Sequence, residues 1–303
     1  MRSIPLRRRI PSFFIQRSMR FGDYVLDYTF GCRDGGVQWS ASGFPDLLTR
    51  HMMFKGAYQM DVLSALRALV QPGDTVFDVG GHHGLMAVVA GQAARPTGLV
   101  VTFEPSPQAR EYLEVHVTLN RAANVVIEPI VLSDREGELP FYLQSGDVSW
   151  NSSIVREFVD PRGEIEPILV KSATVDGYVE GTGRIPTLIK IDTEGSEPAV
   201  LRGACKTIET YLPYLILEFN PKSAEVKGTT IGEMVASLMA HSYKLVVLRR
   251  NWRGYYRFSD QEPFDESTRC TGGGDAQRDL HPRGPILGPA NPVFCNLRFC
   301  SVP

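Results

Sequence analysis

The chain has 303 residues, 43% of them hydrophobic, and a formal net charge of −2 at pH 7. This size and composition suit a globular protein with one large buried core. The near-neutral charge gives no reason to expect nucleic-acid binding, and no apolar run approaches the roughly 18 residues of a membrane span.

From about residue 57, apolar runs typical of strands alternate with segments of helical periodicity, which predicts a parallel sheet with crossover helices. The predicted strands are 75–79, 99–103, 125–132, 187–191, 214–219, 243–248 and 293–299, and the predicted helices are 58–70, 85–94, 107–121, 173–179, 196–211 and 231–241. The sequence therefore predicts an α/β fold with a doubly wound, mostly parallel sheet of seven strands.

Three segments fall outside this alternation. Residues 1–56 are expected to form an N-terminal cap, with a hairpin at 23–39 and a short helix at 44–50. A returning strand at 139–143 leads into residues 144–170, which have polar turns and are expected to form an insertion or lid. Residues 259–292 are rich in Gly, Pro and charge and are expected to form an irregular loop.

Two features bear on the location of the protein. Arg7-Arg8-Arg9 imitates the charged region of a signal peptide, but the apolar stretch after it ends at Gln16, short of the about 7–15 residues that a signal needs. The five cysteines are odd in number and contain no Cys-x-x-Cys pair, which favours reduced thiols. A cytoplasmic location is expected, although the spacing of Cys295 and Cys300 leaves a zinc or disulfide role open.

The most informative motif, Asp78-Val79-Gly80-Gly81-His82-His83-Gly84, follows an apolar run. Glycines at the end of a strand let the backbone turn sharply and approach a ligand, so Gly80, Gly81 and Gly84 are expected to act through the backbone. A carboxylate at Asp78 would repel a pyrophosphate and attract a cationic amino-acid group. S-adenosylmethionine carries such a group.

Acids also stand at or just after the ends of predicted strands, at Asp78, Glu104, Asp134, Asp192 and Glu218. In a doubly wound sheet these ends share one crevice, where ligands bind. Glu104 lies at the spacing from the glycines at which an acid accepts hydrogen bonds from ribose hydroxyls. Ser133 and Asp134 follow the third strand, from where a side chain can reach the exocyclic amine of an adenine. Each acid alone also fits a turn or a helix cap.

The motifs together resemble the FkbM family of S-adenosylmethionine-dependent methyltransferases. The matching stretches are Val76-Phe77-Asp78-Val79-Gly80, Phe103-Glu104-Pro105, Ile189-Lys190-Ile191-Asp192-Thr193-Glu194-Gly195-Ser196-Glu197, Val200-Leu201-Arg202-Gly203-Ala204 and Leu217-Glu218. The resemblance covers about Thr75 to Asn220 and implies a class I, Rossmann-like methyltransferase with S-adenosyl-L-methionine as cofactor; the methyltransferase domain is expected at 57–303. It also implies O-methylation of a small-molecule acceptor: a hydroxyl of a sugar, polyketide or other secondary metabolite.

One part of the loop departs from the family pattern, which usually has Ala-Asn-Ile where this chain has Gly81-His82-His83. His82 takes the asparagine position, where it could contact the methionine portion of the cofactor and still donate a hydrogen bond. In the alternative interpretation His82 caps the following helix and His83 packs against its side.

Methyl transfer needs an aligned acceptor and removal of the acceptor's proton. Asp192 is the leading candidate for acceptor contact or base, and Glu194 is the second. Both acids also fit a structural role as caps of the following helix. An ordinary carboxylate is a weak base for a hydroxyl, so desolvation or a metal would have to help. No metal site is predicted, but Asp192, Glu218 and Asn220 form an oxygen-rich set that would suit Mg²⁺.

Two other functions fit parts of the sequence. A nicotinamide-dependent oxidoreductase shares the glycine loop and the acid of the second strand, but it predicts Gly-x-Gly-x-x-Gly without Asp78. A cofactor-binding protein without turnover would account for the His82-His83 departure. The sequence leaves open the acceptor, the oligomeric state, and whether Trp39 and Trp150 stack on a sugar or fill the core.

Overall fold

The computed structural model describes residues 20–21, 24–25, 27–31, 37–42, 58–144, 152–159, 164–219, 221–226, 228–241, 243–250, 256–259 and 292–297. The helix expected at 44–50, Trp150, Asn220, and all but the two end residues of the loop at 259–292 lie outside the described residues.

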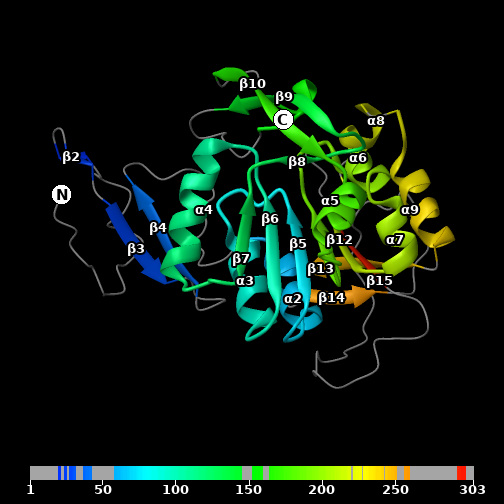
Figure 1. The fold of residues 1–303 in the computed structure, drawn as a ribbon, viewed down its shortest axis with the longest axis horizontal. Helices are drawn as coiled ribbons and strands as arrows, with labels where there is room; N and C mark the ends of the chain where they lie inside the picture. Colours follow the sequence, from blue (N-terminus) through cyan, green and yellow to red (C-terminus); the bar gives the residue numbers. More distant parts are fainter. Residues whose placement is uncertain are drawn as a thin grey trace.

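Within the described residues, the main sheet has eight strands in the order β14-β13-β15-β12-β11-β5-β6-β7 (Figure 1). Their bounds are β5 (Thr75–Val79), β6 (Leu99–Phe103), β7 (Val125–Glu128), β11 (Leu188–Ile191), β12 (Tyr214–Phe219), β13 (Lys244–Arg250), β14 (Tyr256–Ser259) and β15 (Pro292–Leu297). All neighbours pair in parallel except β13 and β14. The sheet therefore has one strand more than the seven predicted, because β14 adds an antiparallel edge.

Helices cover both faces of this sheet. They are α2 (Met60–Leu69), α3 (Leu85–Ala94), α4 (Pro107–Leu119), α5 (Val175–Thr182), α6 (Glu197–Arg202), α7 (Cys205–Tyr211), α8 (Pro221–Val226) and α9 (Ile231–Ala240). Successive strand residues enter different cores: Val76 packs with α2 and α3, whereas Phe77 packs with the helices from α5 onward. Strands buried on both faces explain the continuous apolar runs, and the predicted α/β fold with a mostly parallel sheet is confirmed.

A second, three-stranded sheet has the order β8-β10-β9, with β8 (Val131–Leu132), β9 (Gly137–Gln144) and β10 (Ile165–Ala173). In Figure 1 it lies beyond the arrowheads of β5, β6 and β7. The single strand predicted at 125–132 is therefore wrong. Pro129, which has no N–H to donate, separates β7 from β8, and the two strands join different sheets.

The segment at 144–170 also differs from the prediction, because its last part is regular. Residues 165–170 belong to β10, which pairs antiparallel with β9. Pro167 argues against a strand at the sequence level. It is tolerated because, among the described residues, β8 pairs only with the far end of β10, at Ser172 and Ala173.

The expected N-terminal hairpin is present as β3 (Asp27–Gly31) and β4 (Gln38–Ser42), which pair antiparallel; before them, β1 (Arg20–Phe21) pairs with β2 (Tyr24–Val25). β4 packs along α4 (Figure 1). Trp39 is 0% exposed, and its ring stacks on His116 with 3.8 Å between centroids. Trp39 therefore fills the core.

No helix of the described residues is long and apolar enough to cross a membrane.

Candidate active site

A cavity of about 310 Å³ lies at the carboxyl ends of β5, β6 and β11. Six of the predicted site residues line it: Gly80, Gly81, His82, Glu104, Asp192 and Glu194. Four do not: Asp78, Gly84, Ser133 and Asp134. The remaining wall includes apolar side chains of the small sheet, such as Leu132 and Phe141, so this sheet forms part of the cavity wall.

The glycine loop passes close to the backbone that follows β11. The N–H groups of Gly80 and Gly81 both donate to the carbonyl of Phe103, at 3.1 Å each, which fixes the turn. Gly80 has a φ of 84°, and a Cβ there would overlap the carbonyl oxygen of Asp192. Only glycine fits this approach without displacing Asp192.

Glu104 lies on the cavity wall just beyond β6. Its Oε2 accepts from the N–H of His82 at 2.7 Å, and its Oε1 accepts from the N–H of Ser106 at 2.8 Å. Burial raises the pKa of Glu104 to about 7, against the lowering effect of these two bonds. A carboxylate has about four acceptor positions, so the group keeps capacity for further donors.

Asp78 differs most from its predicted role. It is 1% exposed, and its Oδ1 lies 3.0 Å from the ammonium of Lys190, so its charge faces the sheet rather than the cavity. Thr102 donates to the other oxygen at 3.3 Å. Burial raises the pKa of Asp78, and Lys190 opposes that rise.

Lys190 has no role in the sequence-based prediction, yet it lines the cavity. The sequence did contain a sign of this role, because Lys190 is the one charged residue within the otherwise apolar strand β11. It is next to last in its strand, as Asp78 is in β5, and the two are register partners. Burial alone would lower the pKa of Lys190, but the carboxylates of Asp78 and Asp192 outweigh burial and raise it.

Ser133 and Asp134 do not reach the cavity lining. Asp134 pairs with Arg202, whose Nη2 lies 2.8 Å from its carboxylate, and both side chains are partly exposed. Ser133 is buried and donates its N–H to Ala173 at 2.9 Å. The prediction that this pair reaches an adenine assumed that the main-sheet strand continues to residue 132, whereas β7 ends at Glu128.

Asp192 follows β11 and lines the cavity. Its Oδ2 accepts from Nε2 of Gln59 at 3.2 Å, and Nζ of Lys190 lies 3.8 Å from the same oxygen. Gln59, which precedes α2 and also lines the cavity, is a second residue missing from the prediction. Its contact spans 133 positions of the chain, so no local pattern could reveal it.

The loop after Asp192 is held by Glu197, which is 2% exposed. Its carboxylate accepts from the N–H of Thr193 at 2.9 Å, from the Thr193 hydroxyl at 3.0 Å and from the N–H of Gly195 at 3.1 Å. The loop contains two left-handed residues in succession, Glu194 with φ 49° and Gly195 with φ 110°. Glu197 thus fixes the shape of the loop between Asp192 and α6.

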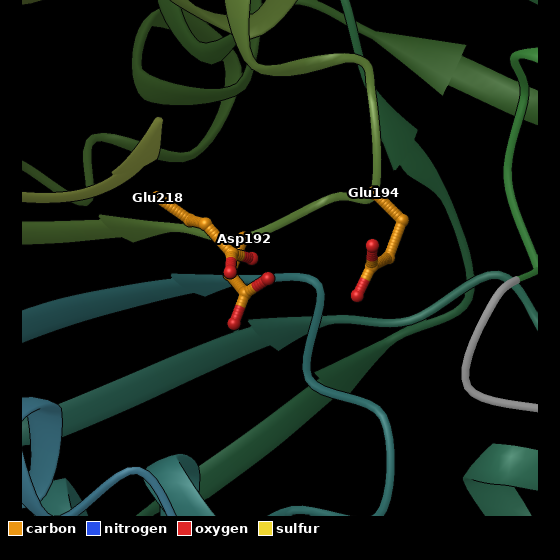
Figure 2. Close-up of side chains that lie close together, drawn as sticks. All are labelled: Asp192, Glu194 and Glu218. Atoms are coloured by element: carbon orange, nitrogen blue, oxygen red, sulfur yellow. The ribbon is translucent and has the colours of Figure 1, made fainter. Parts of the chain in front are cut away.

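Three carboxylates meet beside the cavity (Figure 2). Oxygens of Asp192, Glu194 and Glu218 lie within 4.8 Å of one another. Glu218 belongs to β12, and Glu194 to the loop that follows β11. Of the set considered for Mg²⁺, the structure brings Asp192 and Glu218 together and adds Glu194. The positive charge of Lys190 lies next to this group.

The histidine pair is explained by packing. The rings of His82 and His83 stack with 3.9 Å between centroids, and His83 contacts Tyr112 of α4. Burial, and then the neighbouring His82 and His116, lower the pKa of His83 well below its usual value, so the ring is neutral. Gly84, in the left-handed region, is the N-cap of α3. The N-cap residue is thus Gly84 and not His82, and His83 is buried in contact with α4, whereas the alternative placed it against the helix that follows the loop.

Comparisons with known proteins identify the family of this chain. Residues 78–245 match the family model described as "Methyltransferase FkbM domain". The chain is similar to the 31-O-demethyl-FK506 methyltransferase FkbM of Streptomyces tacrolimicus, at 28% identity over 204 residues, covering 58% of this chain and 75% of that protein.

Two solved structures are also similar. Methyltransferase FkbM from Methylobacillus flagellatus KT matches with a TM-score of 0.38 and 17% identity, over 55% of this chain and 37% of that chain. Precorrin-6y C5,15-methyltransferase from Geobacter metallireducens GS-15 matches with a TM-score of 0.38 and 12% identity, over 67% of this chain and 85% of that chain. This chain thus spans little more than a third of the length of the first structure.

The family match covers more than half of the chain, and apart from Tyr58 and Gln59 it includes every residue that lines the cavity. The chain therefore belongs to the FkbM methyltransferase family.

Proposed function

We propose that this protein uses S-adenosyl-L-methionine to methylate a hydroxyl of a small molecule, such as a sugar, a polyketide or another secondary metabolite. The observation that carries the proposal is the meeting of three features in one cavity: the glycine loop, the buried Glu104 and Asp192. The resemblance of the chain to a 31-O-demethyl-FK506 methyltransferase supports a hydroxyl as the acceptor.

The residues of the cavity fit this cofactor. Gly80 and Gly81 provide a wall without side chains, and Glu104 provides a carboxylate with acceptor positions for two ribose hydroxyls. Asp78 acts indirectly, through Lys190, instead of contacting the cofactor. When bound, S-adenosylmethionine supplies an electrophilic methyl group on a sulfonium. Ser133 and Asp134 are not part of the proposed site.

Asp192 is the proposed acceptor contact. Gln59 and Lys190 hold its Oδ2, which fixes the direction of the carboxylate. A carboxylate in a fixed direction orients a hydroxyl by accepting its hydrogen bond, and takes the proton as the oxygen loses it. Glu194, on the same wall, is the second candidate for contact with the acceptor.

We also propose that the segment at 144–170 acts as a lid that selects the acceptor. Ser152 and Ile154, from this segment, line the cavity. Ser153 donates its hydroxyl to the carbonyl of Glu194 at 2.7 Å, which ties the segment to the loop after β11. The division into a cap at 1–56 and a methyltransferase domain at 57–303 remains a proposal.

Transfer of a labelled methyl group tests the function. Incubation of the protein with methyl-labelled S-adenosylmethionine and a panel of hydroxylated small molecules is expected to give a labelled product. With an acceptor found in this way, Asp192→Asn should lower turnover about 100-fold or more, because it removes the proton acceptor.

The same Asp192→Asn variant should keep its affinity for S-adenosylhomocysteine, the demethylated product, within about threefold, equivalent to under 1 kcal/mol. Calorimetry measures this affinity. Turnover equal to that of the unaltered protein would assign Asp192 to structure instead.

A further inference from the structure

Lys190 brings together parts of the site that are far apart in the sequence. It is the next-to-last residue of β11 and is 4% exposed. Its ammonium lies 3.0 Å from Oδ1 of Asp78, 3.1 Å from the carbonyl oxygen of Gly80 and 3.8 Å from Oδ2 of Asp192. One partner is in β5, one is in the glycine loop and one follows β11.

Charge balance accounts for the contacts with Asp78 and Asp192, but not for the bond to Gly80. An unpaired buried carboxylate at Asp78 would destabilise the fold, and one ammonium beside it removes most of that penalty. The bond to Gly80 adds nothing to that balance, since a carbonyl carries no net charge. It does fix the peptide that follows Gly80, whose N–H donates to Phe103 at the start of the segment that carries Glu104.

The contact with Asp192 extends this arrangement to the opposite wall. Gly80 lies so near the carbonyl of Asp192 that no side chain fits between the two segments. Lys190 contacts both segments, with a hydrogen bond to the carbonyl of Gly80 and an ion pair with Asp192.

We propose that Lys190 is a positioning residue: its ammonium holds the Gly80 carbonyl and Asp192 at a fixed spacing, so that the glycine loop stays in the shape that binds the cofactor. This assignment rests on the proposed function, because the ligand that reports on the loop is the methyltransferase cofactor. Lys190 acts through the loop and through Asp192.

A double-mutant cycle separates positioning from charge balance. The variants are Lys190→Met, Asp78→Asn and the two changes together, each measured by urea unfolding and by calorimetric titration with S-adenosylhomocysteine. Lys190→Met alone leaves Asp78 buried without its cation and should lower stability strongly. The double variant has neither charge and should recover most of that stability.

The deciding comparison is between Asp78→Asn and the double variant, which both lack the carboxylate and differ only at Lys190. Asp78→Asn should bind S-adenosylhomocysteine at least about tenfold more tightly than the double variant, equivalent to 1.4 kcal/mol. The double variant should show this weak binding although it folds stably. Lys206→Met, which removes an exposed lysine 3.7 Å from Glu180, is the matched control and should change neither measurement.

Equal affinity of Asp78→Asn and the double variant would overturn the assignment and reduce Lys190 to a counter-charge for Asp78. Absence of binding by the unaltered protein would instead refute the proposed cofactor, and the assignment with it. The two failures are distinguishable, because only the second appears before any substitution is made.

Discussion

Glu104 is a buried carboxyl group on the cavity wall, and its pKa of about 7 makes its charge sensitive to pH near neutrality. Ribose hydroxyls donate hydrogen bonds most strongly to the ionised form, which predominates above that pKa. The affinity for S-adenosylhomocysteine should therefore rise with pH and level off above about 7, with a loss of up to about tenfold for each pH unit below it. Calorimetry between pH 5.5 and 8 measures this dependence.

The matched variant is Glu104→Gln, which keeps the shape of the side chain and cannot ionise. It should bind more weakly, and with an affinity that does not change over the same pH range. An unchanged pH dependence in Glu104→Gln would assign the titration to another group. The stability of the fold should change in the opposite direction. Folding raises the pKa of Glu104 above its usual value of 4.5, so the contribution of this group to the free energy of unfolding should fall as the pH rises toward 7.

Gly80 has a backbone conformation that favours glycine, and it also has no room for a side chain. Gly80→Ala would place a methyl group on the carbonyl of Asp192, at a φ of 84° that non-glycine residues avoid. We expect the affinity for S-adenosylhomocysteine to fall at least about tenfold, or 1.4 kcal/mol, because the loop must move away from Asp192. Calorimetry measures the affinity, and urea unfolding measures the accompanying loss of stability.

Gly183→Ala is the control for backbone strain alone. Gly183 has a φ of 69°, and a Cβ there meets nothing within 4 Å. This variant should lose about 1 kcal/mol of stability and no cofactor affinity. Equal effects of both substitutions on affinity would show that the close approach to Asp192 is irrelevant to the site.

At the scale of elements, the loop between β11 and α6 depends on Glu197. Glu197→Ala removes a buried carboxylate that accepts from two backbone N–H groups and one hydroxyl, so the free energy of unfolding should fall by about 2–3 kcal/mol. Thr230→Ala, which removes the side-chain cap of α9, should cost about 1 kcal/mol. Urea unfolding compares the two, and a smaller loss for Glu197→Ala would mean that the loop holds its shape without it.

The local sequence pattern predicted the bounds of those elements in which most residues are buried. β5, β6, β12 and α3 have the bounds predicted from the sequence, because a glycine, proline or acid follows the apolar run or helical period within two residues in each case. β10 and the break between β7 and β8 were missed. Both depend on prolines, whose effect is decided by which neighbouring strand is present, and that pairing is long-range.

At the scale of the whole molecule, the sequence predicts which residues meet at the site to the extent that it predicts the order and direction of the strands. Parallel strands place their carboxyl ends together, so Glu104 and Asp192 could be assigned to one crevice from their positions alone. The topology does not predict the direction in which a side chain points. Asp78 faces Lys190 within the sheet, and Asp134 faces Arg202 outside the cavity.

The cavity also links the site to global stability, because its walls come from β5, β6, β11 and the small sheet. A ligand that binds there stabilises the folded chain by about 2.7 kcal/mol at 100 times its Kd. S-adenosylhomocysteine should therefore raise the midpoint of urea unfolding, and the Gly80→Ala variant should show a smaller rise. An equal rise in both proteins would locate the ligand elsewhere.

The central claim is that this cavity holds a sulfonium cofactor. Calorimetric titration of the unaltered protein with S-adenosylhomocysteine, and separately with NADH, tests it most directly. Saturable binding of S-adenosylhomocysteine at one site per chain, without binding of NADH, is the predicted result. Tight binding of NADH with no binding of S-adenosylmethionine or S-adenosylhomocysteine would contradict it.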